Sequence, residues 1–93
     1  LDQVHLLKIF KAHTRSLQKK LRTKGITISI SDDAATYICT AAASEGMGAR
    51  PLKRLIKTEV EDKIVSYYYK NSSREKTHFN FHLSEKDIIY SID

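Results

Sequence analysis

The stretch Gly46-Met47-Gly48-Ala49-Arg50-Pro51-Leu52-Lys53-Arg54 limits most strongly what this chain can fold into. Two glycines bracket one residue, and Arg50 stands immediately before Pro51, the only proline in the chain. Proline is favoured at the first position of a helix, and the residue before a proline is pushed away from helical backbone. The stretch therefore predicts a tight turn at the glycines, an extended Arg50 and a helix that begins at Pro51.

The helix predicted from Pro51 extends to about Lys70 and has one apolar face. Its free N–H groups lie beside the Arg50 guanidinium, an arrangement suited to holding a phosphate or a carboxylate. A plainer alternative is that Arg50 pairs with a surface carboxylate of the chain itself. The apolar face consists of Leu52, Leu55, Ile56, Val60, Ile64, Tyr67 and Tyr68. Favourable charge pairs four residues apart are Lys57–Glu61 and Glu59–Lys63.

Hydrophobic periodicity predicts the remaining elements. A long amphipathic helix is expected over about residues 1–24 with Gly25 at its C-cap, a strand over residues 26–30, and a second helix over about residues 33–44. Ser31 is well placed to cap that second helix. Alternation of Phe79, Phe81 and Leu83, and then of Ile88, Tyr90 and Ile92, predicts a β-hairpin with its turn at Ser84-Glu85-Lys86-Asp87.

The predicted order is helix, strand, helix, helix, strand, strand. This corresponds to an α/β (α+β) fold, in which three helices pack on a three-stranded sheet in a single domain over residues 1–93. Leu17 and Leu55 are expected in the core. The first helix should face inward through Leu6, Leu7, Phe10, Leu17 and Leu21, and the second through Ala34, Tyr37, Ile38 and Ala41.

The charge and the cysteine content of the chain limit which partners and which kinds of site it can have. The net charge of +5 suits an anionic partner such as a nucleotide, a nucleic acid or an acidic protein face. Cys39 is the single cysteine, so no internal disulfide can form, and its mid-helix position indicates a small apolar filler. The longest apolar runs fall far short of the ~20 residues of a membrane helix. The histidine spacings indicate no metal site.

Two further features each leave an alternative open. The first helix carries a stripe of basic residues. This stripe is interpreted as the solvent-facing side of the helix, or alternatively as a surface that contacts a neighbouring subunit or phosphates. Tyr67, Tyr68 and Tyr69 are read as packing against the hairpin, or as a stacking platform for single-stranded nucleic acid. The stripe comprises Lys8, Lys11, Arg15, Lys19 and Arg22.

The motif Gly-Ala-Arg-Pro-Leu-x-Arg, at Gly48 to Arg54, resembles the second-sensor motif of Clp-type AAA+ unfoldases and chaperones such as ClpA, ClpB and ClpC. In that family the motif lies in a small C-terminal domain that follows an ATPase core. The similarity extends over most of the chain, including Lys24-Gly25-Ile26 and Ser31-Asp32-Asp33-Ala34. The sequence departs from the family at Ala42-Ala43-Ser44, where a Gly-Tyr-Asp-like turn is common.

The resemblance implies a nucleotide-responsive lid. Arg50 would contact an ATP phosphate, supported by Gly48, Ala49 and Pro51. Lys53 and Arg54 would be candidates for a subunit contact. The resemblance also implies an upstream core that binds ATP with Mg, a homo-hexamer, unfolded or aggregated protein substrates, a protease as a further partner, a role in the stress response, and a cytoplasmic or organelle-matrix setting.

The chain lacks both Walker motifs, so these residues alone should hold no catalytic group and should not hydrolyse ATP. The alternative function is a small basic nucleic-acid-binding module, which the charge, the basic stripe and the tyrosine run would favour.

Overall fold

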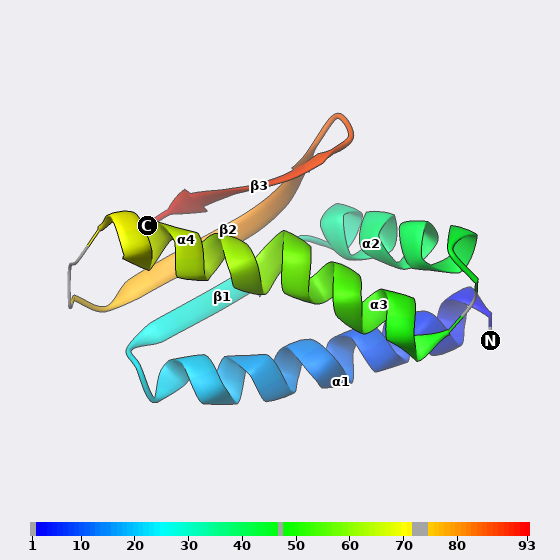
Figure 1. The fold of residues 1–93 in the computed structure, drawn as a ribbon, viewed down its shortest axis with the longest axis horizontal. Coiled ribbons are helices and arrows are strands. Elements are labelled where there is room, and N and C mark those ends of the chain that lie inside the picture. The colour runs from blue at the N-terminus through cyan, green and yellow to red at the C-terminus, as the bar shows by residue number, and fades with distance from the viewer. Residues whose placement is uncertain (1, 47, 72–74) are drawn as a thin grey trace.

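The computed structural model describes residues 2–46, 48–71 and 75–93. Within these ranges α3, η1 and α4 form one continuous helix, so the fold has three helices and a three-stranded sheet in the predicted order (Figure 1). The elements are α1 (Gln3–Arg22), β1 (Ile26–Ile30), α2 (Asp32–Ser44), α3 (Ala49–Ile56), η1 (Lys57–Glu61), α4 (Asp62–Lys70), β2 (Thr77–Ser84) and β3 (Asp87–Ile92).

Strand β2 lies at the centre of the sheet. It pairs antiparallel with β3, which confirms the predicted hairpin, and Ser84 and Asp87 are the last pair before the turn. On its other side β2 pairs in parallel with β1, so that Ile28 lies opposite Phe79. A parallel pair needs a long crossover connection, and the second and third helices provide it here.

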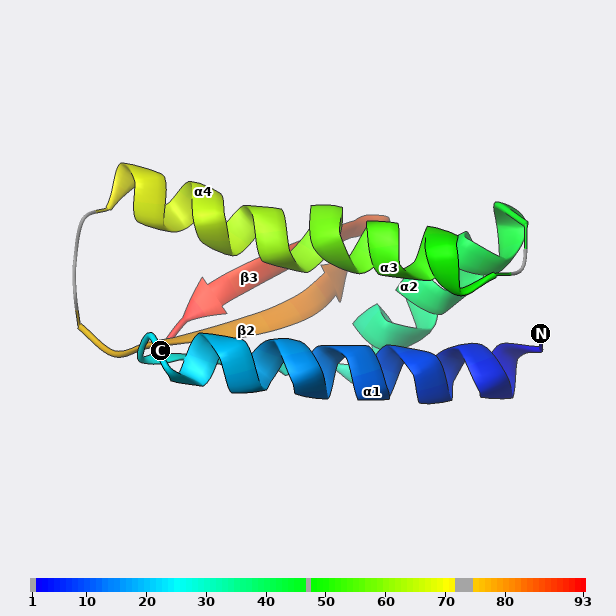
Figure 2. The same ribbon diagram turned by 60° about the horizontal axis from the view of Figure 1, so that its bottom comes forward.

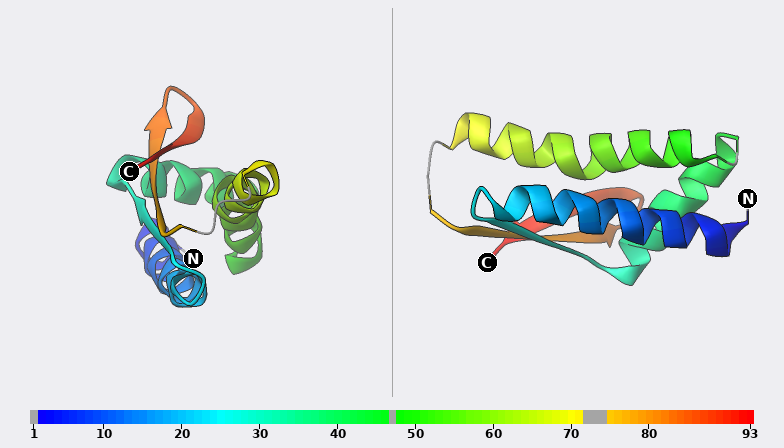
Figure 3. Two further views of the ribbon diagram at one scale, coloured as in Figure 1. Left: turned by 90° about the vertical axis from the view of Figure 1, so that its left-hand side faces the viewer. Right: turned by 90° about the horizontal axis from the view of Figure 1, so that it is seen from below.

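The helices surround one face and one side of the sheet. The continuous α3–η1–α4 helix lies over one face, α1 runs along the β1 side, and α2 continues beyond the end of β1 (Figures 2 and 3). Helix α1 and the α3–α4 helix run in the same direction. As a result, the start of α3 lies at the same end of the molecule as the start of α1 and the end of α2.

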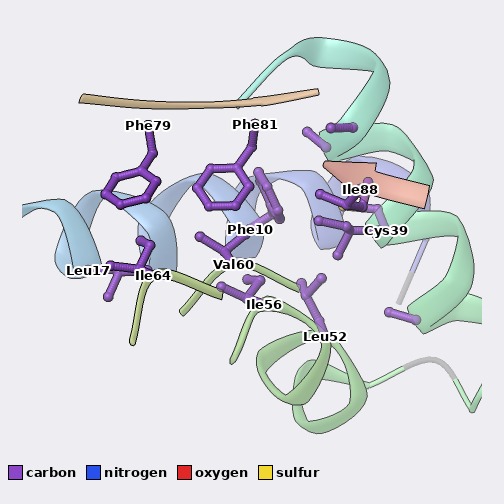
Figure 4. Packing of buried hydrophobic residues seen from close by; sticks show 14 of the residues in the cluster. Phe10, Leu17, Cys39, Leu52, Ile56, Val60, Ile64, Phe79, Phe81 and Ile88 are labelled. Atoms are coloured by element: carbon purple, nitrogen blue, oxygen red, sulfur yellow. The ribbon is translucent and has the colours of Figure 1, made fainter. Parts of the chain in front are cut away.

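The core lies between the sheet and the helices. Phe79 and Phe81 point from β2 toward the α3–α4 helix, and both are almost completely buried, at 0% and 1% exposure (Figure 4). Tyr67 and Tyr68 make edge contacts with Phe79, which confirms that they pack against the hairpin. Tyr69 is 82% exposed, so it is the one ring of the tyrosine run that faces solvent.

Helix α1 is slightly shorter than the predicted range of residues 1–24. The Asp2 carboxylate caps it by accepting a hydrogen bond from the His5 N–H at 3.0 Å, and this bond lowers the pKa of Asp2. The helix ends at Arg22 with Thr23 as its C-cap, so the prediction of Gly25 as the C-cap is wrong. Gly25 instead has a left-handed backbone, with φ of 78°, in the turn that leads to β1. Leu1 lies outside the described residues.

Helix α2 begins as predicted, because the Ser31 hydroxyl accepts a hydrogen bond from the Ala34 N–H at 3.2 Å. Its inward face differs from the prediction, since Tyr37 and Ala41 are only half-buried. Helix α2 packs against α1, α3 and β2, and these neighbours on several sides bury a wider arc of the helix than the predicted stripe. The buried residues are Ala34, Ala35, Ile38, Cys39 and Ala42.

The segment η1 is a π-helical turn inside the third helix. The Asp62 N–H bonds to the Lys57 carbonyl, five residues earlier. The Lys57 ammonium therefore pairs with Asp62 at 3.0 Å, and the predicted Lys57–Glu61 pair is wrong. This hydrogen bond raises the pKa of Lys57. The other predicted pair, Glu59–Lys63, is confirmed at 3.1 Å.

The π-turn keeps the buried residues of the helix in line. Leu52, Ile56, Val60 and Ile64 recur every four residues, and all four are buried. In a regular α-helix a four-residue repeat drifts by about 40° per step, because each residue turns by roughly 100°. One wider turn offsets that drift, so a single face can reach both α2 and the sheet.

Burial predicts different costs for two leucine truncations. Leu17 is buried as predicted, whereas Leu55 is only half-buried at the edge of the core, which corrects its assignment as a core residue. Leu17→Ala should lower the free energy of unfolding by ~2–5 kcal/mol, because it leaves a cavity. Leu55→Ala should cost about 1 kcal/mol. Urea unfolding curves of both variants measure this, and equal costs would contradict the assigned burial.

Candidate functional site

The turn between α2 and α3 requires glycine at one position. Helix α2 ends at Ser44, and Gly46 follows with φ of 120°, a backbone conformation that other residues rarely adopt. Gly48 has φ of −134° and ψ of 169°, which is extended backbone open to any residue. The predicted tight turn is therefore present, but of the two glycines only Gly46 is needed for its backbone angles. Met47 lies outside the described residues.

Helix α3 begins at Ala49, two residues earlier than predicted. Gly48 is its N-cap, so the extended residue at the helix entry is Gly48, and the prediction of an extended Arg50 is wrong. Proline is tolerated throughout a first helical turn, because the first N–H groups have no intrahelical acceptor. The bias that Pro51 places on Arg50 is a preference, and burial of Leu52 and Ile56 in the core outweighs it.

Helix α3 has an apolar face and an opposite cationic face. Leu52 and Ile56 are buried, the exposed side carries the cations Arg50, Lys53 and Arg54, and Lys57 follows on the same side at the start of η1. Two of these cations are paired within the chain. Arg54 donates to the Glu45 carboxylate just after α2, and Lys57 pairs with Asp62.

Arg50 and Lys53 have no hydrogen-bond or ion-pair partner among the described residues. Both side chains are exposed. The plainer alternative, in which Arg50 pairs with a carboxylate of its own surface, is therefore not what the described chain contains. Sequence reasoning missed Glu45 as a partner of Arg54, because the turn at Gly46 is what brings the two residues together.

The starts of α2 and α3 differ in charge. Ser31 caps α2 with its side chain, and Asp32 and Asp33 lie in its positive first turn. The first turn of α3 has no acidic residue, and its N-cap Gly48 provides no side-chain acceptor. The partial positive charge of α3 is thus reinforced by Arg50 rather than neutralised, a combination that favours binding of an anion from outside the chain.

The other candidate groups do not join this site. Cys39 is fully buried, and burial raises the pKa of its thiol, in keeping with its predicted role as an apolar filler. The described residues bring together no group of three or more His, Cys, Asp or Glu side chains that could hold a metal ion. Across residues 2–46, 48–71 and 75–93, no helix is both long and apolar enough to cross a membrane.

Comparison with known proteins places most of the chain in one family. Residues 1–81 match the family described as the C-terminal, D2-small domain, of ClpB protein. The chaperone protein ClpB of Prochlorococcus marinus is 28% identical over 91 residues, which is 98% of this chain and 10% of that protein. The ATP-dependent Clp protease ATP-binding subunit ClpL of Staphylococcus aureus is 30% identical over 89 residues, covering 96% of this chain and 12% of ClpL.

The two glycines of the turn should respond differently to alanine. Gly46→Ala should lower the free energy of unfolding by about 1–3 kcal/mol, because a side chain strains the backbone at φ of 120°. A Cβ at Gly48 would meet the Pro51 Cδ at an ordinary 3.5 Å, so Gly48→Ala is the matched control without backbone strain and should cost about 0.5 kcal/mol, because alanine is a poorer N-cap than glycine. Thermal unfolding measures both, and a Gly48→Ala cost equal to that of Gly46→Ala would refute this account of the turn.

Proposed function

This chain belongs to the family of C-terminal D2-small domains of ClpB, and we propose that it is the nucleotide-sensing lid of a Clp-type AAA+ ATPase. It spans about a tenth of the length of the curated relatives it matches. In our proposal the rest of a longer protein supplies the ATPase core, which binds ATP with Mg. The chain contributes one arginine to a site that the core completes.

Arg50 carries the proposal. Its guanidinium is exposed, lacks a partner among the described residues and stands in the first turn of a helix with no acidic residue there. An arginine in this position can donate two parallel hydrogen bonds to two oxygens of a phosphate. We assign it to the γ-phosphate of ATP, where it senses whether that phosphate is present.

The rest of the helix supports this role mechanically. Leu52 and Ile56 anchor α3 in the core, so a force on Arg50 is transmitted to the whole domain rather than to a loose side chain. Loss of the γ-phosphate would release Arg50 and let the lid swing away from the core. Lys53 is the better candidate for a contact with a neighbouring subunit, because Arg54 is already engaged with Glu45.

The proposed role as a lid domain implies an assembly, an activity and a cellular location for the longer protein. The assembled machine would be a homo-hexamer that unfolds or disaggregates proteins with the energy of ATP, in the cytoplasm or an organelle matrix, with or without a protease partner. The single observation in favour of this setting is the match of the chain to the ClpB D2-small family. The basic nucleic-acid module receives less support, because Tyr67 and Tyr68 are used in packing against the hairpin.

Replacing Arg50 in the full-length, assembled protein tests the proposal. Arg50→Ala should lower steady-state ATP turnover at least tenfold, because a cation near the transferring phosphoryl group is lost; arginines acting on such transition states are worth about 10³–10⁵ in rate. Arg50→Lys should restore only part of the activity, since an ammonium lacks the planar fork.

Lys70→Ala is the matched control, because Lys70 is an exposed cation at the far end of the same continuous helix with no partner among the described residues. It should leave turnover per assembled hexamer within about twofold of the unchanged protein, since loss of a surface charge costs little. Assembly is checked by size-exclusion chromatography with light scattering. Unchanged turnover in assembled Arg50→Ala would refute the proposed role of Arg50.

A further inference from the structure

The outer edge of β1 is capped over part of its length by a side chain. Gln18 of α1 donates from its amide Nε2 to the Ile26 carbonyl at 3.0 Å and accepts from the Ile28 N–H at 2.7 Å. One amide group thus replaces the hydrogen bonds that a neighbouring strand would make. This contact shows which ligand chemistry the edge of β1 accepts.

The next backbone pair along the same edge is uncapped. Bonds from Thr77 N to Gly25 O and from Ser31 N to Phe81 O show that odd-numbered residues of this segment bond to β2. Alternate residues of a strand direct their backbone groups to opposite sides, so the Ile28 carbonyl and the Ile30 N–H face outward. Neither group has a side-chain partner within the described chain.

These two groups face a groove between α1, β1 and the start of α2, which we call the α1–β1 groove. It has a volume of about 320 Å³, and Phe10 lies in its floor, almost fully buried. Its lining is apolar at the bottom and charged at the rim. The lining residues are Phe10, Lys11, Thr14, Arg15, Gln18, Ile28, Ile30, Asp32 and Ala35.

The rim of the groove is mainly cationic. Lys11 and Arg15 are exposed and form no ion pair with any described residue, and Lys8 and Lys19 continue the basic stripe along α1. The Thr14 hydroxyl is already bonded to the Phe10 and Lys11 carbonyls, so it is not the ligand group here. Asp32 is the one acidic residue in the lining.

We propose that the α1–β1 groove is a docking site for a protein segment that carries a carboxylate side chain between apolar side chains. Backbone N–H and C=O groups of the segment pair with the Ile28 carbonyl and the Ile30 N–H, as the Gln18 amide does one step earlier on the edge. The carboxylate accepts hydrogen bonds from the Lys11 and Arg15 cations, and the apolar side chains cover the half-buried Ile28 and Ile30.

Charge complementarity selects an acidic segment. The free backbone pair matches the N–H and C=O groups of a peptide. Nucleic-acid bases would need an exposed ring for stacking, and Phe10 is buried.

This proposal does not depend on the lid function. None of its residues lies in α3, and it can be tested on the 93-residue chain itself, whose described residues bury one hydrophobic cluster between the sheet and the helices. A failure of the Arg50 experiment would leave the groove untouched. A failure of the groove experiment would leave the nucleotide role of Arg50 untouched.

The test is a nuclear magnetic resonance titration of the ¹⁵N-labelled chain with a short, end-blocked peptide of alternating leucine and glutamate. We expect the amide signals of Ile30 and Ile28 to shift with saturation in the millimolar range or below. The same peptide with glutamine in place of glutamate should bind more weakly. Absence of saturable shifts at Ile30 at millimolar peptide would overturn the proposal.

Two charge reversals on α1 distinguish a specific groove from a generally basic surface. Arg15→Glu should weaken peptide binding about tenfold, because the attraction between Arg15 and the peptide carboxylate becomes a repulsion between two carboxylates. Each has the size of a solvent-exposed ion-pair interaction. Lys20→Glu is the matched control: Lys20 is exposed on the same helix but outside the groove, and its reversal should cost less than about twofold at moderate salt.

Two outcomes of this comparison would overturn the proposal. If Arg15→Glu and Lys20→Glu lowered the peptide affinity equally, the binding would be non-specific attraction to a basic surface. Tighter binding of a single-stranded oligonucleotide, with shifts at the same groove residues, would assign the groove to nucleic acid instead. The spectra of both variants also check that each remains folded.

Discussion

The packing of Phe79 and Phe81 against the continuous α3–α4 helix is the interaction on which the rest of the structure depends. Both rings are buried, and both come from β2, the strand that pairs with each of the other two. The aromatic contact therefore joins the whole sheet to the third helix. Because Val60 and Ile64 lie beneath these rings, the rotation of that helix about its axis is fixed (Figure 4).

That rotation determines what the start of the helix presents to solvent. Leu52 and Ile56 continue the same buried line, and the π-turn at η1 corrects the drift that a four-residue repeat would otherwise accumulate. With the apolar side held inward, Arg50 can only face outward. The exposed arginine at the site is thus a consequence of core packing far from it, and no local hydrogen bond is needed to hold it there.

Much of this could be predicted from the sequence, because apolar periodicity and capping residues are local signals. The element order, the Ser31 cap and the hairpin are confirmed. The parallel pairing of β1 with β2 could not be predicted, since it joins residues about 50 positions apart and depends on how the helices cross over. The π-turn also left no recognisable signal, so the Lys57–Glu61 pair was wrongly expected where Lys57–Asp62 forms.

At the candidate site, the motif predicted Arg50 correctly as a residue at a helix start. The backbone conformation of Arg50 and the pairing of Arg54 with Glu45 could not be predicted, because both depend on the tertiary structure.

The most direct test of the central claim is the affinity of the full-length protein for a slowly hydrolysed ATP analogue and for ADP. Arg50→Ala should weaken binding of the ATP analogue and leave ADP binding unchanged, because only the former has a γ-phosphate. Equal weakening of both nucleotides, or of neither, would contradict the assignment of Arg50 as a γ-phosphate sensor.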